Sequence, residues 1–240
     1  MSTEKRIIGT ILLTAAPVLA CAQPVKGAYL GAALGWDLPQ QQTINQTAVV
    51  GSPLNIDWSS GSAGMASLGY GLGNGFRFEL EASYRKNTID AITGTDVPNV
   101  SAGSRQTSAL MLNAAYDFNV GRAWVYPYLG VGIGHVWTTI DDYSLGPQDA
   151  RAFGMRASGS DGATAYQAIA GASFPVAGFA GLAITVDYRF TGTWADQNYS
   201  AYKINPQNRR TDGFLSLGVQ QHSTILLGVR YVFGARPVAP

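Results

Sequence analysis

Alternation of apolar and charged residues is the sequence feature that most constrains how this chain can fold. Between Phe76 and Arg85, every even position carries an aromatic or apolar residue, and four of the five odd positions are charged. Successive side chains of a strand point to opposite faces, whereas a helix would scatter both sets. The segment therefore predicts a strand with one apolar and one ionic face. A half-buried strand of a soluble sandwich explains the pattern equally well, so the rest of the chain must decide.

The composition argues against a soluble domain. Only 13% of the 240 residues are charged and 46% are hydrophobic, whereas roughly 25% are charged in an ordinary soluble protein. Beyond the amino end, no uninterrupted apolar run reaches the roughly 18 residues that a membrane-spanning helix needs. A chain too apolar for water that has no such run indicates a membrane β-barrel, whose strands carry a weak, alternating signal.

The amino end predicts export. Lys5 and Arg6 precede an apolar run over residues 7–19, and Ala20-Cys21-Ala22 follows as a cleavage site, which is typical of a secretory signal peptide. We therefore expect residues 1–22 to be removed. A short buried helix is one alternative. The stretch "VLAC" also resembles a lipoprotein box, in which Cys21 would be lipidated.

Charge and cysteine usage exclude several classes of function. Cys21 is the only cysteine, and cleavage would remove it or lipidation consume it, so neither a disulfide nor a cysteine-based metal site is expected. Removing residues 1–22 leaves 14 basic and 14 acidic residues. A neutral chain has no electrostatic footprint for nucleic acid. We expect no metal and no cofactor.

Period-two patterns recur along the chain and predict an all-β fold, an eight-stranded antiparallel up-and-down transmembrane β-barrel over residues 23–234. The tail, residues 235–240, is rich in Pro and Ala. Short links are expected near 73–75, 119–123 and 175–180, and long polar links near 38–60, 87–105, 139–163 and 193–212, the asymmetry of a bacterial outer-membrane barrel. The expected strands are 27–36, 63–72, 76–86, 108–118, 125–137, 165–174, 182–190 and 223–233.

The inward face of these strands predicts an ion-pair network in the lumen. A closed barrel of eight strands has an interior just wide enough to be filled by side chains, and buried charges there must be paired. Gly130, Gly132 and Gly134 would leave room for long side chains from opposite strands. The predicted network comprises Arg77, Glu79, Glu81, Arg85, Asp117, Asp187, Arg189 and Arg230.

Aromatic residues near strand ends predict an interfacial belt, because their rings suit the level of the lipid headgroups. A carbohydrate-binding cleft is the alternative. The belt residues are Trp36, Tyr70, Tyr84, Tyr126, Trp137, Tyr188 and Tyr231.

Two histidines are candidates for catalytic groups. His135 with Asp141 and Asp142 suggests a protease rim that resembles that of the omptins, but the alternation points His135 outward beside Trp137. His222 is interpreted as a strand-end residue. We expect no enzymatic activity.

The stretches "YPYLGVGIG", "VDYRF" and "HSTILLGVRYVFG" resemble the OmpA-like family of small outer-membrane barrels over roughly Gly27 to Gly234. The resemblance implies an assembly signal for the barrel assembly machinery, with Gly228, Tyr231 and Phe233 at its glycine and aromatic positions. Leu226 departs from that signal, as do the seven residues after Phe233. The tail "GARPVAP" resembles the start of a linker to a periplasmic peptidoglycan-binding domain. Either the chain is a barrel-only member or it is a fragment.

Three functions remain open. The first is a structural barrel that anchors and stiffens the bacterial outer membrane. A narrow, low-conductance pore is the second. The third is a surface adhesin or antigen that acts through the long external loops, whose extracellular ligand the sequence does not identify. The expected partners are outer-membrane lipid and, during insertion, the barrel assembly machinery.

Overall fold

The computed structural model describes residues 25–47, 54–93, 100–122, 124–146, 154–204, 207 and 209–235. The predicted signal peptide and residues 236–240 of the tail lie outside them. The described chain is all-β, with antiparallel pairing throughout. Its strands are β1 (Lys26–Pro39), β2 (Gln42–Thr47), β3 (Leu54–Trp58), β4 (Gly61–Leu72), β5 (Phe76–Thr93), β6 (Val100–Asp117), β7 (Tyr126–Gly146), β8 (Gly154–Pro175), β9 (Leu182–Thr193), β10 (Gln197–Ile204), β11 (Arg210–Leu217) and β12 (Gln221–Val232).

The predicted count of eight strands is wrong, because the described residues form twelve. The four additional strands, β2, β3, β10 and β11, lie in or beside the links predicted to be long and polar. These four strands also carry inward apolar residues such as Ile56 and Leu215, which are buried in a core of their own.

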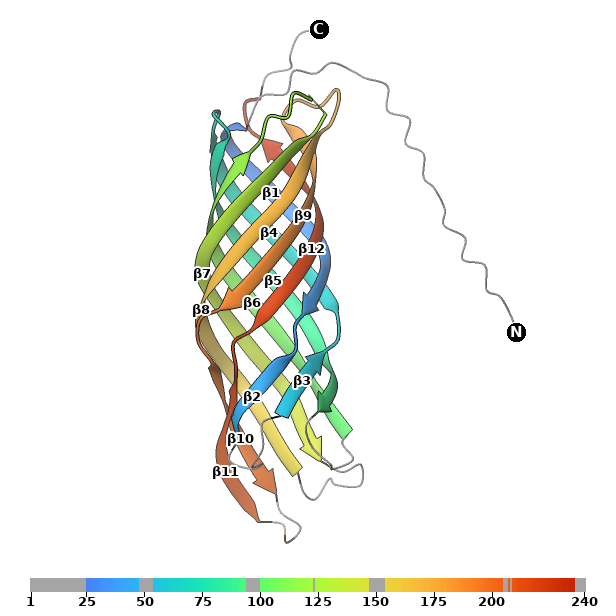
Figure 1. Ribbon diagram of the computed structural model, residues 1–240, viewed down its shortest axis with the longest axis vertical. Helices are drawn as coiled ribbons and strands as arrows, with labels where there is room; N and C mark the ends of the chain where they lie inside the picture. The colour runs from blue at the N-terminus through green and yellow to red at the C-terminus, as the bar shows by residue number, and fades with distance from the viewer. Residues whose placement is uncertain are drawn as a thin grey trace, which may run out of the picture.

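The ladders close into a barrel in two sections (Figure 1). At the end with short turns, β1, β4, β5, β6, β7, β8, β9 and β12 pair in that order, and β12 pairs with β1. We call this section the turn-side barrel. At the other end, β3, β2, β11 and β10 connect β5 to β8. With residues 89–93, 100–103, 141–146 and 154–160 they form the loop-side barrel.

The turn between β4 and β5 shows how the sequence sets a tight connection. Gly73 and Gly75 have φ of 82° and 101°, a region that side chains with a Cβ seldom adopt. The Asn74 Oδ1 atom accepts a hydrogen bond from the Phe76 backbone N–H at 3.1 Å. The predicted hairpin at 73–75 is therefore confirmed.

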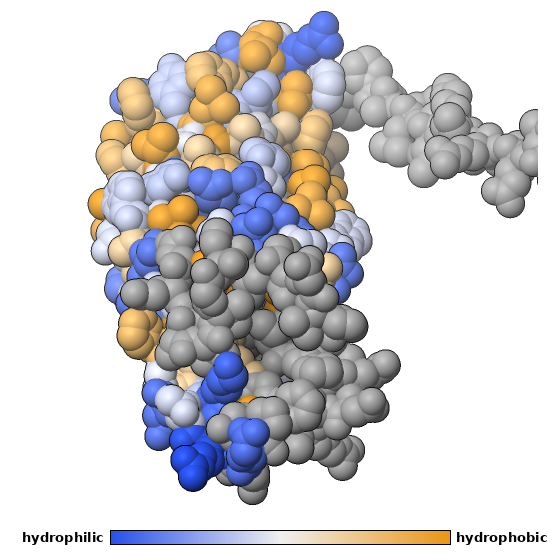
Figure 2. Space-filling view, turned by 60° about the horizontal axis from the view of Figure 1, so that its bottom comes forward, coloured by the Kyte–Doolittle hydropathy of each residue, from blue (hydrophilic) through white to orange (hydrophobic). Residues whose placement is uncertain are grey.

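The two faces of the turn-side barrel follow the predicted alternation. Large apolar side chains such as Leu34, Leu80 and Val186 are exposed on the outside, while their neighbours are buried inside. Hydrophobic residues cover much of the upper surface in Figure 2, and strongly hydrophilic residues lie at the bottom. Tyr126 is an exception to the predicted belt, because it is buried, whereas the other six belt residues are exposed.

The loop-side barrel has the opposite arrangement. Its interior is an apolar core, and its outer positions include Thr43, Asp90, Arg156 and Ser158. The buried members of the core are Ile44, Ile56, Trp58, Ile92, Ile140, Met155, Ala157, Tyr199, Ala201, Leu215 and Leu217. Burial raises the pKa of the Tyr199 phenol; the neutral phenol donates a hydrogen bond to Gln197 Oε1 at 3.2 Å.

Glycines on β7 make room for neighbouring side chains. A Cβ at Gly132 would collide with the Asn113 side chain, and one at Gly134 would meet the Met111 sulfur. Asn113 and Met111 belong to β6, which pairs directly with β7. The room predicted at these glycines therefore exists, but adjacent rather than opposite strands fill it.

Candidate functional site: the filled lumen

All eight charged residues predicted for the lumen are buried inside the turn-side barrel. They reach it through strand parity, because Arg77, Glu79, Glu81 and Arg85 occupy alternate positions of β5 and share one face. The same parity brings Asp117 inward from β6, Asp187 and Arg189 from β9, and Arg230 from β12.

Arg77 organises the part of the lumen nearest the short turns. Its Nε atom lies 3.1 Å from Asp117 Oδ1, and its Nη1 atom lies 3.3 Å from Glu79 Oε2. The same Nη1 donates to the Tyr29 hydroxyl at 3.1 Å, and that hydroxyl donates to Glu79 Oε2 at 3.1 Å. The guanidinium also lies 4.5 Å from the centre of the Tyr128 ring, which suits a cation–π contact.

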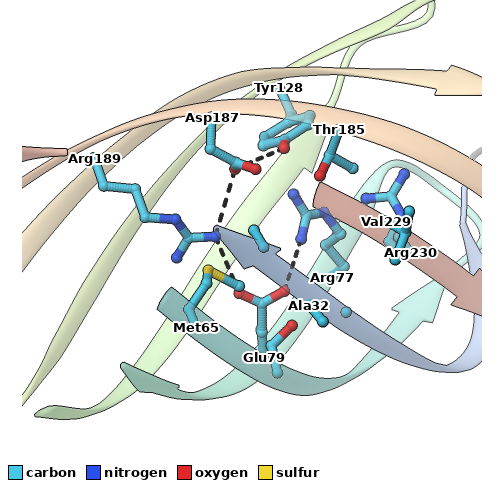
Figure 3. A pocket seen from close by; sticks show the side chains of 13 residues that line it. Ala32, Met65, Arg77, Glu79, Tyr128, Thr185, Asp187, Arg189, Val229 and Arg230 are labelled. Carbon is cyan, nitrogen blue, oxygen red and sulfur yellow. Dashed lines mark hydrogen bonds and ion pairs between the residues drawn. The ribbon is translucent and has the colours of Figure 1, made fainter. Parts of the chain in front are cut away.

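Arg189 is the centre of the next layer (Figure 3). It forms an ion pair with Glu81, and its Nη2 atom lies 3.7 Å from Glu79 Oε1 and 3.4 Å from Asp187 Oδ1. The Tyr128 hydroxyl donates to Asp187 Oδ1 at 2.7 Å. One cation thus neutralises carboxylates from two strands, β5 and β9.

Amides add to the coordination of Glu81 at one oxygen, Oε2, whereas Oε1 has no hydrogen-bond partner among the described residues. Asn113 Nδ2 and Gln167 Nε2 donate to Glu81 Oε2 at 2.7 and 3.0 Å. Because hydrogen bonds to a buried charge are stronger than neutral ones, these amides help Arg189 to hold the carboxylate in place.

Two predicted members of the network have other partners. Arg230 forms no ion pair within 4 Å among the described residues; its Nη2 donates to Ser173 Oγ at 2.8 Å, and its guanidinium lies 5.7 Å from the Tyr29 ring centre. Arg85 lies 3.6 Å from Asp37 Oδ1, an acidic residue that the sequence analysis did not include.

Asp37, Arg105 and His222 are lumen residues that the sequence analysis missed. His222 is not merely a strand-end residue, because its Nδ1 atom lies 2.7 Å from Asp37 Oδ2 inside the barrel. Arg105 falls at the end of the predicted link 87–105. In the structure it is buried on β6, with its guanidinium 4.0 Å from the Trp58 ring centre. The alternation along each strand could have identified all three. Residue 37 follows the outward Trp36, so it faces inward, and residues 105 and 222 lie an even number of positions from the inward Thr107 and Arg230.

Little space remains between these side chains. The cavity beside Arg77, Glu79, Asp187, Arg189 and Arg230 measures about 20 Å³, enough for about one water molecule. Beyond the polar layers, the apolar core of the loop-side barrel fills the interior. Buried side chains therefore occupy the described lumen in both sections.

His135 lies on the outer side of the barrel. Its ring centre is 4.7 Å from that of Trp137, in an edge contact. Asp141, six residues further along β7, accepts a hydrogen bond from Gln106 at 3.0 Å. At about 3.3 Å per residue, His135 and Asp141 are roughly 20 Å apart along the strand, too far to act on one water. The side chain of Asp142 lies outside the described residues.

The three residues of the predicted assembly signal lie on or just after β12. Gly228 faces inward, where a Cβ would come 2.6 Å from the Cβ of Ala33. Tyr231 and Phe233 are exposed on the outside, with ring centres 5.4 Å apart. Reading of this signal by an assembly machinery stays a prediction.

No helix among the described residues is long and apolar enough to cross a membrane. The same part of the chain holds no group of three or more His, Cys, Asp or Glu side chains placed to bind a metal ion.

The family follows from comparison with known sequences. The family profile described as "Outer membrane protein beta-barrel domain" matches residues 8–233. The chain belongs to this family. A Gluconacetobacter diazotrophicus relative described as "Outer membrane protein" is 27% identical over 249 residues, which cover 99% of this chain and 65% of that protein. The chain thus spans 65% of the length of the curated relative it matches.

Solved structures show the same fold. The outer membrane protein OprG from Pseudomonas aeruginosa has a TM-score of 0.56 at 14% identity, covering 87% of this chain and 98% of that chain. Neisserial surface protein A has a TM-score of 0.50 at 16% identity, covering 88% and 100%. At these identities the likeness concerns the fold. With the family match, it places the protein in the bacterial outer membrane.

Proposed function

We propose that this outer-membrane protein is a structural barrel whose lumen is closed by paired charges, and that it has no enzymatic activity. The observation that supports this role is the series of buried side chains in the interior, from Arg77 at the short turns to Leu215 in the loop-side core. A filled barrel contributes stiffness and a lipid-facing surface to the envelope, and it leaves no steady path for solutes.

In this proposal the turn-side barrel is the eight-stranded part that crosses the bilayer. Its outward apolar row on β1 runs from Ala28 to Trp36, which agrees with the 9 to 11 residues of a typical transmembrane strand. The short turns would face the periplasm and the loop-side barrel would stand outside the cell.

Planar-bilayer recording tests the closed lumen. Wild-type conductance should be small and intermittent, because Arg77 and Arg189 hold carboxylates across the path. Glu79→Ala removes a carboxylate that both arginines contact, and it should lengthen open times by admitting water. Leu112→Ala, on the outward face, is the control and should not change conductance. A large, steady wild-type conductance would mean an open aqueous channel, and a pore function would then replace the structural one.

A second role, surface display, is favoured by the loop-side barrel. Its β10–β11 hairpin projects furthest from the turn-side barrel (Figure 1), and Arg210 lies 4.2 Å from the Tyr202 ring centre on its outer part. Replacing the tip between β10 and β11 with a short turn should abolish adhesion to a host cell or matrix without changing the gel mobility of the unheated barrel. Unchanged adhesion would remove this role for the hairpin.

A further inference from the structure

Two buried arginines, Arg85 and Arg105, lie near each other at the junction of the turn-side barrel and the loop-side barrel. Arg85 lies opposite Thr107 in the β5–β6 ladder, and Arg105 lies opposite Asn87. The two arginines are therefore diagonal neighbours on the inward face, a relation that places residues about 7–8 Å apart. Both are almost fully buried.

Asp37 is the carboxylate beside this arginine pair, and its oxygens are already engaged. Oδ2 lies 2.7 Å from His222 Nδ1, while Oδ1 accepts a hydrogen bond from Thr224 at 2.8 Å and lies 3.6 Å from Arg85 Nε. Arg105 instead donates to Gln42 Oε1 at 3.0 Å. Within 4 Å, only Arg85 pairs with this carboxylate, and Arg105 forms no ion pair in the described part of the chain.

Several buried N–H groups in this region have no acceptor within hydrogen-bonding distance among the described residues, since Asp37 Oδ1 at 3.6 Å is too far from Arg85 Nε for a hydrogen bond. They belong to Arg85, through Nε and Nη1, to Arg105, through Nε and Nη2, and to the Trp58 indole. Asn87 Oδ1 is the one buried acceptor there without a donor. An unsatisfied buried donor is destabilising, and more so when it is charged, so a ligand with several acceptor positions would be stabilising.

We propose that Arg85 and Arg105 bind a small monovalent anion of the chloride class between them, with the Trp58 indole N–H as a further donor. An anion accepts hydrogen bonds from several directions and also balances the second guanidinium charge, whereas water satisfies donors but adds no charge. The pair lies between the Arg189 layer and the apolar loop-side core, surroundings that favour a small ion. This inference does not depend on the proposed structural role.

Arg230 provides a matched comparison. It is also a buried lumen arginine without an ion pair within 4 Å, but it lies near the short turns with one orphaned atom, Nε. It contacts Ser173 and the Tyr29 ring, and the Arg77 guanidinium that shares this ring is already paired with Asp117 and Glu79.

Bromide substitution tests the site directly. Crystals of the wild-type barrel grown in sodium bromide should show an anomalous scattering peak between the guanidinium groups of Arg85 and Arg105, and none beside Arg230. Density that water alone explains, with no anomalous signal at that position, would overturn the proposal.

Folding equilibria give a second measurement. In lipid vesicles at constant ionic strength, replacing gluconate with chloride should stabilise the folded wild type. Above the dissociation constant of chloride, each tenfold rise in chloride concentration should raise the folding equilibrium constant about tenfold. Arg105→Gln should remove this dependence, and Arg230→Gln should keep it. Equal stability of the wild type in both salts would contradict chloride binding, and the bromide crystals decide if Arg105→Gln does not fold.

Discussion

The two sections of this barrel share strands but reverse which residues face inward. In the turn-side barrel, β5 buries Glu81 and exposes Leu80, whereas in the loop-side barrel the same strand buries Ile92 and exposes Asp90. The hydrogen-bonded ladder is antiparallel in both. The difference follows from the surroundings: lipid requires an apolar exterior, and water allows a polar exterior with an apolar core.

The reversal also determines what each interior can do. Packed apolar side chains need no partners, whereas buried charges are stabilised by partners, since an unpaired buried charge is costly. The turn-side lumen is therefore held together by specific pairs, and the loop-side lumen by shape and area. Four changes, ordered from the largest expected effect, test this contrast.

Arg189→Met should cause the largest loss of stability, because it leaves Glu79, Glu81 and Asp187 without their shared cation. Breaking a buried ion pair from one side costs about 3–5 kcal/mol. A urea titration of folding in lipid vesicles measures this free energy of unfolding. Adding Glu81→Gln to Arg189→Met should recover part of it, and a strictly additive double mutant would argue against the pairing.

Leu215→Ala should weaken the loop-side barrel by about 2–5 kcal/mol, because Leu215 is fully buried in its core. The loss should be local, so that protease or hydrogen exchange attacks β10 and β11 while the turn-side strands stay protected. Phe214→Ala is the matched control, because its side chain is exposed. Loss of protection throughout the barrel would mean that the two sections do not unfold separately.

Leu80→Arg should cost about 2–4 kcal/mol if Leu80 lies near the bilayer midplane. The same substitution at Thr88, an outward position further along β5, should change the unfolding free energy little because the arginine would enter water or headgroups. Equal costs at the two positions, measured in the same vesicles, would show that the lipid boundary does not lie between them.

Asp212→Asn should have the smallest effect. The Arg210–Asp212 pair is 2.6 Å long but mostly exposed, and exposed ion pairs contribute about 0–1 kcal/mol. An unfolding titration should place this variant within about 1 kcal/mol of the wild type. A loss as large as that of Arg189→Met would mean that this exposed ion pair stabilises the barrel far more than exposed pairs usually do.

Sequence reasoning predicted the turn-side barrel because its faces differ strongly. Leu80 is apolar because it faces lipid, and the adjacent Glu81 is charged because it faces the lumen. The period-two pattern can therefore be recognised in one strand without knowing which strands pair with it. The particular pairs were not predictable, since they depend on how strands stagger. Arg189 on β9 contacts Glu81 on β5, and no local spacing links two strands so far apart in sequence.

The loop-side barrel was not predicted because its strands are short and their apolar residues are isolated. Ile56 and Trp58 in β3 alternate with Asn55 and Asp57, a pattern of two pairs that also fits a polar loop. Arg105 was not predicted for the same reason, because it follows a polar stretch of β6 in which the alternation is weak. These segments become strands through pairing with distant partners, such as β3 with β5.

The most direct test of the reversed arrangement is a spin-label scan along β5, with single cysteines from Phe76 to Thr93 in a Cys21→Ser background. Accessibility to oxygen reports contact with lipid, and accessibility to a water-soluble nickel chelate reports contact with water. We predict that even positions from Phe78 to Tyr84 contact lipid, that Thr88 and Asp90 contact water, and that Ile92 is protected from both reagents. Lipid contact that continues through Asp90, or an accessible Ile92, would contradict the two-section barrel.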